Sequence, residues 1–377
     1  MEATAVPPLA GSDILGRRVL KEEERVYVAS QWRLMWLHFR RHRLAMVGLA
    51  VLLMLYGIAL VHPFVAPYEK GTRSSFIYRP PQGVHFDGLS VFVYGTAVKR
   101  DLATLSRSFE DDPSQRYYVH LFTHGDKYDF LGLFESDLHL FGVEKGGTLF
   151  LMGTDDLGRD LFSRILYGGA ISLSVGMVGV LTSFVIGVTI GGISGYYGGW
   201  LDTVLQRLVE LLFTIPTIPL WMGLGAAVPT GWDQLKTYVA ITSILGLISW
   251  PRLARVVRSK LLETRTEDFV MAARLAGLRD RQIIFRHLLP ASLSYLIVYM
   301  TLAIPEVILA ETALSFLNLG LRPPMVSWGV LLQSAQNIGA VNTYPWLIWP
   351  GAFVVLTVMA FQFMGDGLRD AADPYKS

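Results

Sequence analysis

The residues of this sequence that could carry chemistry inside a membrane are carboxylates within long apolar runs. Glu210 lies one helical turn after Arg207, its obvious ion-pair partner. A carboxylate at bilayer depth is costly unless it is paired, so such residues are candidates for a polar pathway or a proton site. Prolines near them bend a helix, which is tolerated where its wall lines a cavity. The pathway candidates are Glu210, Pro216, Pro219, Glu306 and Glu311.

Glu306 is the better of the two later carboxylates for lining a polar pathway. For Glu311, a structural hydrogen bond to a neighbouring helix is an equally good interpretation. Both therefore stay on the list of candidates with different expected roles.

Other kinds of chemistry lack the residues they need. The chain has no cysteine, which excludes a thiol nucleophile, a thiolate metal site and a disulfide. It has no Gly-x-x-x-x-Gly-Lys-Ser/Thr loop to hold nucleotide phosphates. His120 and His124 have no third ligand nearby in the sequence, and two such histidines are usually ordinary surface or core residues. We therefore expect no catalytic residue, no metal and no cofactor, and energy must come from another protein.

The elements that must position these residues are membrane helices. Hydrophobic residues make up 52% of the chain and charged ones 17%, which is a membrane-protein composition. About 20 apolar residues cross a bilayer, and six runs approach that length: 44–61, 170–193, 208–228, 235–256, 291–314 and 346–364. Pro251 and Arg252 interrupt the fourth run, so five spans is the fallback prediction.

The distribution of basic residues predicts the orientation of these spans. Segment 251–290 is rich in arginine, whereas the short loops predicted on the opposite side hold only Lys236 and Arg322. Cytoplasmic loops of membrane proteins carry the excess of Lys and Arg. We therefore expect segment 251–290 and both chain ends on the cytoplasmic side, and segment 67–152 outside.

Segment 67–152 has the composition of a small folded domain. Turn signals separate short runs rich in aromatic and β-branched residues, which predict strands at Ser90–Tyr94, Tyr117–Thr123 and Thr148–Leu151. In the stretch that follows, Asp155, Asp156, Arg159, Asp160 and Arg164 are spaced for ion pairs on a helix at the membrane surface. We expect a β-rich external domain followed by such a helix.

The second apolar run repeats small residues every four positions, at Gly179, Ser183, Gly187, Gly191 and Gly195. Such a stripe lets another helix approach closely in lipid. Packing within the chain is the favoured interpretation, and packing against a second subunit is the alternative.

The polar stretch 264–290 predicts two short helices joined by a hinge. Thr264 and Glu267 form a capping box that would start the first helix. Gly277 suits the left-handed conformation that ends it, and Pro290 fits the first turn of the next span. One face would carry an aromatic residue and three alanines, namely Phe269, Ala272, Ala273 and Ala276. This stretch could lie on lipid headgroups, but a face of small residues favours close approach of another protein.

These residues resemble a known family. Ala272-Ala273, Gly277 and Leu289-Pro290 resemble the EAA loop of ABC-importer membrane subunits, although Met271 and His287 depart from that pattern. The ending Arg286-His287-Leu288-Leu289-Pro290 is similar to the dipeptide and oligopeptide permease branch, and so are 153–176, 315–320 and 365–374. The resemblance covers roughly 29–68 and 150–374, and it suggests the second-permease type with an enlarged external domain.

The resemblance implies an all-α polytopic membrane protein with six spans in the type I ABC importer fold and a β-rich insertion between spans 1 and 2. Its parts would be a cytoplasmic segment 1–43, helix 44–62, external domain 67–152, importer core 153–364 and cytoplasmic tail 365–377. It also implies that the loop docks into an ATPase through Glu267, Phe269, Ala272, Ala273, Ala276, Gly277, Arg281, Arg286 and Pro290. Gly277→Asp or a bulky residue at Ala273 should then abolish uptake.

The partners that the resemblance implies are a second homologous permease, two ATP-binding-cassette ATPases, an extracytoplasmic binding protein and the bilayer of a bacterial inner membrane. The expected function is a permease subunit carrying peptides, with nickel or oligosaccharides as alternative substrates and no nucleic acid partner. Two other classes stay open. One is a proton-coupled transporter using Glu210, Glu306 or Glu311, and the other is a membrane anchor for the external domain.

Overall fold

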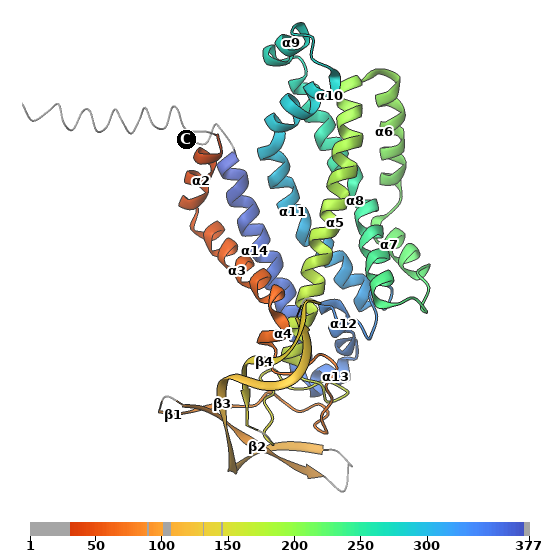
Figure 1. Ribbon diagram of the computed structural model, residues 1–377. Coiled ribbons are helices and arrows are strands. Elements are labelled where there is room, and N and C mark those ends of the chain that lie inside the picture. The colour runs from red at the N-terminus through yellow and green to blue at the C-terminus, as the bar shows by residue number, and fades with distance from the viewer. Residues whose placement is uncertain (1–30, 89, 101–106, 131, 145, 373–377) are drawn as a thin grey trace, which may run out of the picture.

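The computed structural model describes residues 31–88, 90–100, 107–130, 132–144 and 146–372. Figure 1 shows a bundle of long helices with a small sheet at one end and the short helices α9 (Asp268–Leu275) and α10 (Asp280–Ile283) at the other. Predictions about residues 1–30 and 373–377 lie outside the described residues. The two ends of the bundle are called the sheet end and the α9 end below.

Five described helices are long and apolar enough to cross a membrane. They are α3 (Arg43–Leu60), α5 (Leu161–Tyr197), α8 (Gln234–Thr264), α11 (Leu289–Phe316) and α14 (Trp349–Ala372). Helices α6 (Gly199–Thr214) and α7 (Thr217–Ala226) qualify only as a pair, bent by 82°. Pro251 does not interrupt α8, which continues through it. The broken span is therefore the third run and not the fourth.

The bend between α6 and α7 follows from Pro216. The residue before a proline is pushed out of the helical region, and Ile215 has φ −87° and ψ 122°. Pro216 itself has ψ 127° and becomes the residue preceding α7, whose first turn contains Pro219. The prediction that two prolines interrupt this span is confirmed.

The small-residue stripe of α5 packs against α8 of the same chain. A Cβ atom added to Gly187 would lie 2.9 Å from Leu253 Cβ, and one added to Gly195 would lie 2.8 Å from the Arg258 carbonyl oxygen. Side chains larger than hydrogen would push the two helices apart at these points. Packing within the chain is confirmed as the role of the stripe.

The sheet is an antiparallel meander in the order β1-β2-β3-β4. Its strands are β1 (Val84–Asp87), β2 (Ser90–Arg100), β3 (Arg107–Phe130) and β4 (Phe134–Val143). The first half of β3 pairs with β2 and its second half pairs with β4. The predicted β-rich segment between the first two long helices is confirmed.

The third predicted strand, Thr148–Leu151, is wrong. Its backbone bonds to the stretch before β1 and not to a strand, since the Phe150 carbonyl oxygen accepts a hydrogen bond from Gln82 N–H at 2.9 Å. Leu149 N–H donates to the Tyr68 hydroxyl (2.8 Å), and Phe150 N–H donates to Gln82 Oε1 (2.6 Å). These bonds tie the segment to the stretch before β1 without adding a strand.

The predicted surface helix after the sheet is also wrong in its first part. Gly153 and Gly158 have φ +77° and +71°, which a helix cannot contain. Helix α5 begins only at Leu161, where the Asp160 side chain accepts a hydrogen bond from Ser163 N–H (2.7 Å). From there the helix runs on into the second span.

Most of the charges of this stretch are buried, and Asp156 is the exposed exception. The Asp155 carboxylate pairs with Arg159 Nε (2.7 Å) and with Arg164, and its side chain is 3% exposed. Nearby, the Arg79 side chain, 2% exposed, donates to Asp111 Oδ1 at 3.0 Å. The sheet end is thus held by buried ion pairs.

Short helices complete both ends of the bundle. They are α2 (Gln31–Arg41), α4 (His62–Val65), α12 (Trp328–Leu332) and α13 (Ile338–Thr343). Phe39 of α2 and Ala45 of α3 pack with Ala371 near the end of α14. The described part of the predicted tail, 365–372, therefore completes α14 as a packed helix.

Candidate functional site

The polar loop 264–290 lies at the α9 end of the bundle (Figure 1). It contains α9 (Asp268–Leu275) and α10 (Asp280–Ile283), and a π-turn at Ile284–Leu288 leads into α11. Gly277 between the helices has φ +77°, and Pro290 is in the first turn of α11. The prediction of two short helices with a left-handed glycine hinge is confirmed.

The predicted capping box is wrong. Thr264 is the last residue of α8, and its hydroxyl donates to the Lys260 carbonyl oxygen at 2.8 Å. A threonine bonded to the preceding helical turn cannot cap the next helix. Glu267 takes the capping position of α9 without a side-chain hydrogen bond.

Helix α9 has one buried face and one exposed face. Val270 and Ala273 are 0% and 7% exposed and belong to one core cluster with Ile283 of α10. Ala273 was predicted on the face that meets a partner, so that assignment is wrong. It is one turn from Val270, and the two pack in one cluster with Ile283 of α10 and Leu288 of the π-turn.

The exposed residues of α9 are mostly apolar, with the charged Asp268 and Arg274 exposed among them. Phe269 is 42% exposed, Met271 47% and Leu275 89%. Ala272 and Ala276 are exposed beside them. Leu275 was not among the predicted contact residues, because the predicted face was defined by Phe269 and the alanines. Its position three residues after Ala272 on the same face was the signal.

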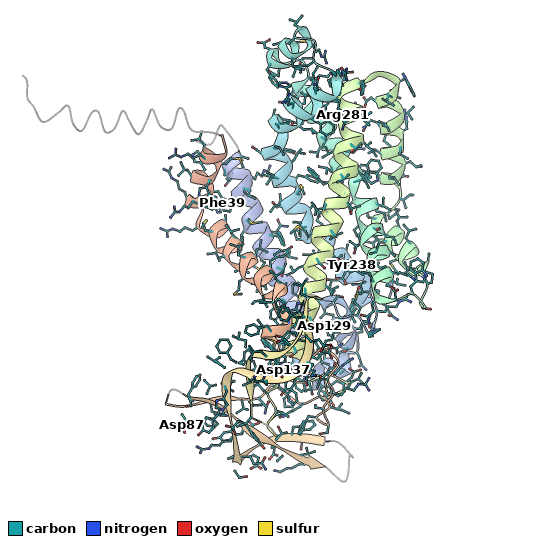
Figure 2. All side chains as sticks on the ribbon, viewed as in Figure 1. Phe39, Asp87, Asp129, Asp137, Tyr238 and Arg281 are labelled. Carbon is teal, nitrogen blue, oxygen red and sulfur yellow. The ribbon has the colours of Figure 1, made fainter. Side chains whose placement is uncertain are left out.

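Three contacts attach this loop to the bundle through Tyr196, at the end of α5. The Tyr196 hydroxyl donates to Asp280 Oδ1 at 2.7 Å, and the Arg274 guanidinium lies 5.5 Å from the centre of its ring. Arg265 Nη1 donates to the Tyr196 carbonyl oxygen at 3.3 Å. Both helices of the loop therefore contact the same side chain. Figure 2 labels Arg281, which is exposed at this end, as is Arg286.

A bidentate ion pair near the loop joins α6 to α8. Arg258 donates to both carboxylate oxygens of Asp202, at 2.6 Å each. Ser194 of α5 donates to the same carboxylate. Bidentate pairs of this kind fix orientation as well as distance, so α5, α6 and α8 are held together next to the loop.

A cavity of about 910 Å³ of empty volume, open to solvent, lies beside the bend between α6 and α7. Glu306 of α11 and Arg252 of α8 both line it, and their side chains pair at 3.3 Å while staying 63% and 62% exposed. Aromatic residues complete the wall, namely Phe213, Trp221 and Tyr299. Sequence reasoning missed Arg252 as a wall residue, although it was noted as a break in an apolar run.

The remaining pathway candidates do not line this cavity. Glu210 pairs with Arg207 at 2.9 Å as predicted, but both side chains are exposed on α6. Pro216 and Pro219 are exposed at the bend, where they shape the cavity without being part of its wall. Of the predicted pathway residues, only Glu306 lines the cavity. Its neighbours there, Arg252 and the aromatic residues, were not predicted as wall residues.

Glu311 is completely buried and bonded. Its carboxylate accepts hydrogen bonds from the hydroxyls of Ser172 (3.2 Å), Ser315 (2.7 Å) and Ser327 (2.7 Å). These residues come from α5, α11 and the turn before α12. The structural interpretation of Glu311 therefore holds, and it joins three segments.

The described residues contain no group of three or more side chains that could hold a metal ion. His120 pairs with Glu144 at 3.1 Å and His124 with Asp137 at 2.9 Å, all exposed on the sheet. The two histidines are ordinary surface residues.

Two family models match this chain. Residues 187–376, half of the chain, match the binding-protein-dependent transport system inner membrane component. Residues 30–81 match the N-terminal TM domain of oligopeptide transport permease C.

Similar proteins carry related names. A putative peptide permease protein of Brucella suis is 42% identical over 224 residues, 59% of this chain and 72% of that protein. The dipeptide transport system permease protein DppC of Bacillus subtilis is 31% identical over 343 residues, 90% of this chain and 84% of that one. The glutathione transport system permease protein GsiD of Pectobacterium atrosepticum is 41% identical over 223 residues, 59% of this chain and 72% of it.

Among solved structures, the inward-facing MetNI methionine ABC transporter matches 56% of this chain and 97% of its own chain, at 23% identity and a TM-score of 0.44. The family assignment rests on the sequence matches. Since a family model covers half of the chain and a 42% identical relative is matched over 72% of its length, this chain belongs to the inner-membrane permease components of binding-protein-dependent ABC transport systems.

Proposed function

We propose that this permease carries peptides into a bacterial cell across the inner membrane. It would pair with a second homologous permease, be driven by two separate ATPases, and accept peptide from an extracytoplasmic binding protein. The α9 end and both chain ends would be cytoplasmic, and the sheet would be outside. Relatives named as peptide and dipeptide permeases support the substrate class, and the arginine-rich 251–290 segment supports the orientation.

The observation that carries the proposal is the exposed apolar face of α9. Leu275, 89% exposed, projects beside Phe269 and Met271 from a helix whose other face is packed. An apolar helical face next to small residues suits insertion into a groove of another protein. We propose that the ATPase contacts this face. The predicted set then loses Ala273 and gains Leu275, and keeps Glu267, Phe269, Ala272, Ala276, Gly277, Arg281, Arg286 and Pro290.

The cavity supports a role as the pathway. Arg252 and Glu306 lie far from the ends of α8 and α11, yet both are more than half exposed. Charged side chains at bilayer depth face a water-filled cavity or another protein, because lipid exposure is too costly. We propose that this surface faces the second permease across the pathway. One cation, one anion and aromatic rings suit a zwitterionic peptide better than an uncharged oligosaccharide.

The proton-coupled alternative is less well supported by the same side chains. A carrier carboxylate must exchange protons freely, whereas Glu210 and Glu306 are paired with arginines and Glu311 is held by three serines. The anchor alternative leaves the charged cavity unexplained, because presenting an external domain requires no cavity between spans.

The test is transport by the chain reconstituted with its partner permease, ATPases and binding protein in proteoliposomes. Uptake of a labelled dipeptide should require ATP inside and should be unaffected by a proton uncoupler. Uptake that collapses with the uncoupler and persists without ATP would contradict the proposal. Leu275→Asp should abolish ATP-driven uptake while the permease stays in the membrane.

A further inference from the structure

The second half of β3 exposes two adjacent apolar side chains, Leu121 (69% exposed) and Phe122 (60%). Neighbours in a regular strand point to opposite faces, and residues two apart share a face. Phe122 would thus share the face of His120 and His124, whose hydrogen-bonded contacts with Glu144 and Asp137 are exposed to water. The Phe122 side chain departs from this alternation.

Phe122 has φ +57°, a left-handed conformation that an aromatic residue rarely adopts. It also drops out of the paired register, in which Leu121 pairs with Phe141 and Thr123 with His139. The ring is redirected and lies 6.3 Å from the ring of Phe64 in α4. Strained residues of this kind often mark a functional surface.

Phe64 fixes the height of this doublet relative to the membrane. Helix α3 ends at Leu60, and Phe64 follows one turn later in α4. A residue one turn beyond the end of a span lies at the level of the lipid headgroups, where aromatic side chains are favoured. The doublet, Leu121 and Phe122, is therefore presented at that level with most of its surface uncovered.

The same hairpin presents a second apolar site at its tip. Leu133 is 76% exposed and Phe134 58%, and the ring of Phe134 stacks on Phe130 at 5.4 Å. Figure 2 places Asp129, next to the tip, at the level where the long helices end, whereas Asp87 of β1 lies far from the bundle. The residue that precedes the tip is thus at the level where the spans end.

We propose that the β3–β4 hairpin is a membrane anchor whose doublet and tip insert shallowly into the lipid headgroup region at the sheet end. The hairpin is tied to the spans beside it, because His139 Nδ1 bonds the Ala66 carbonyl oxygen (2.5 Å) and Phe141 packs on Phe162 of α5. Lipid is the occupant because Phe122 contacts Phe64, which follows by one turn the exposed end of the apolar helix α3 at Leu60 (60% exposed). The anchor would fix the sheet's tilt over the mouth of the bundle.

The absence of cysteine in the chain allows a direct test. Phe122→Cys and Leu133→Cys are labelled with an environment-sensitive fluorophore, and the full chain is placed in nanodiscs containing phosphatidylcholine spin-labelled near the headgroup. Phe86→Cys is the matched control, because Phe86 is a 75% exposed phenylalanine of the same sheet in β1, next to the distant Asp87. Quenching at 122 and 133 should be several-fold stronger than at 86.

Equal quenching at all three positions would overturn the proposal. So would labels at 122 and 133 that respond only when the partner permease or a binding protein is added, since the hairpin would then be a protein-docking surface. Leu133 lies in the turn, so the label at position 133 still reports membrane insertion if Phe122→Cys perturbs the strand. The measurement needs neither ATP nor substrate, and it is therefore independent of the proposed peptide transport.

Discussion

The two ends of this bundle are built in opposite ways. At the sheet end, Asp155 and Arg164 are 3% and 6% exposed and pair with each other, and Arg79 is buried against Asp111. At the α9 end, apolar side chains such as Leu275 are left uncovered, and few polar contacts hold the loop. The comparison teaches that buried charge pairs fix the segments next to the sheet, whereas the loop at the α9 end leaves an apolar helix face uncovered, which we propose the ATPase covers.

The energetics of the two ends differ accordingly. Removing one partner from a buried ion pair leaves an uncompensated charge and costs about 3 to 5 kcal/mol. An uncovered apolar face costs little to alter within the free chain but much in a complex, where central residues contribute about 2 to 4 kcal/mol of affinity. Variants at the sheet end should therefore affect folding, and variants at the α9 end should affect assembly.

The largest effect on folding is expected for Asp155→Ala. Arg164 would lose its carboxylate and stay buried and unpaired, and Arg159 would keep only the exposed Asp156. The stability of the purified chain should fall by about 3 to 5 kcal/mol, measured by chemical or thermal unfolding in detergent.

The control for that variant is Asp156→Ala. Asp156 is 47% exposed and lies 3.4 Å from Arg159, so its loss should change stability by less than about 1 kcal/mol. Similar losses for both variants would mean that the sheet end does not depend on its buried charges, and the contrast between the ends would disappear.

The next largest effect is expected for Leu275→Asp, in assembly and not in folding. A charge on the exposed face of α9 should weaken ATPase binding by about 2 to 4 kcal/mol, or about 30-fold to 1,000-fold, with unfolding unchanged. Co-purification of the ATPases and their coupled ATP hydrolysis are the measurements. Leu235→Asp, at a 71% exposed leucine at the start of α8, is the matched control and should keep the ATPases bound.

A smaller effect is expected for Ala273→Leu, which separates the two faces of α9. Ala273 is 7% exposed against Val270 and Ile283, so a larger side chain should overpack the loop at about 1 to 3 kcal/mol. Ala272→Leu adds the same side chain to the exposed face and should leave stability within about 0.5 kcal/mol. If instead Ala273→Leu left unfolding intact and Ala272→Leu destabilised the chain, the assignment of faces would be reversed.

This difference between Ala272 and Ala273 also marks the limit of sequence reasoning. The length of apolar runs located the spans, and proline and glycine located the bend and the hinge at Gly277, because those two features depend on local backbone preferences. Periodicity could not separate neighbouring alanines, since the buried one is defined by Ile283 from another helix. The expected break of α8 at Pro251 is wrong because of a contact with another helix too. Helix α8 packs closely against α5 next to Pro251, at Leu253 and Ala254.

The candidate cavity illustrates the same limit. Glu306 was predicted as a pathway residue from its depth in an apolar run. Arg252 and Tyr299 became visible as its neighbours only once α8 and α11 were placed side by side. Glu311 was ambiguous in the sequence, since its partners Ser172 and Ser327 are 139 and 16 residues away.

The smallest expected effect tests how the loose end is attached. Tyr196→Phe removes only the hydroxyl that donates to Asp280, while the ring under Arg274 remains. A single hydrogen bond of this kind to a charged group contributes about 1.5 to 3 kcal/mol at most, and less where water can replace it, so global unfolding should change by about 1 kcal/mol. Hydrogen exchange in α10 should nevertheless speed up locally, because the contact is one of few that hold it. Tyr197→Phe, at the exposed neighbouring tyrosine, should leave exchange unchanged. Equal exchange in both variants would show that α10 is held by its buried Ile283 alone, and that the polar contacts at this end add nothing.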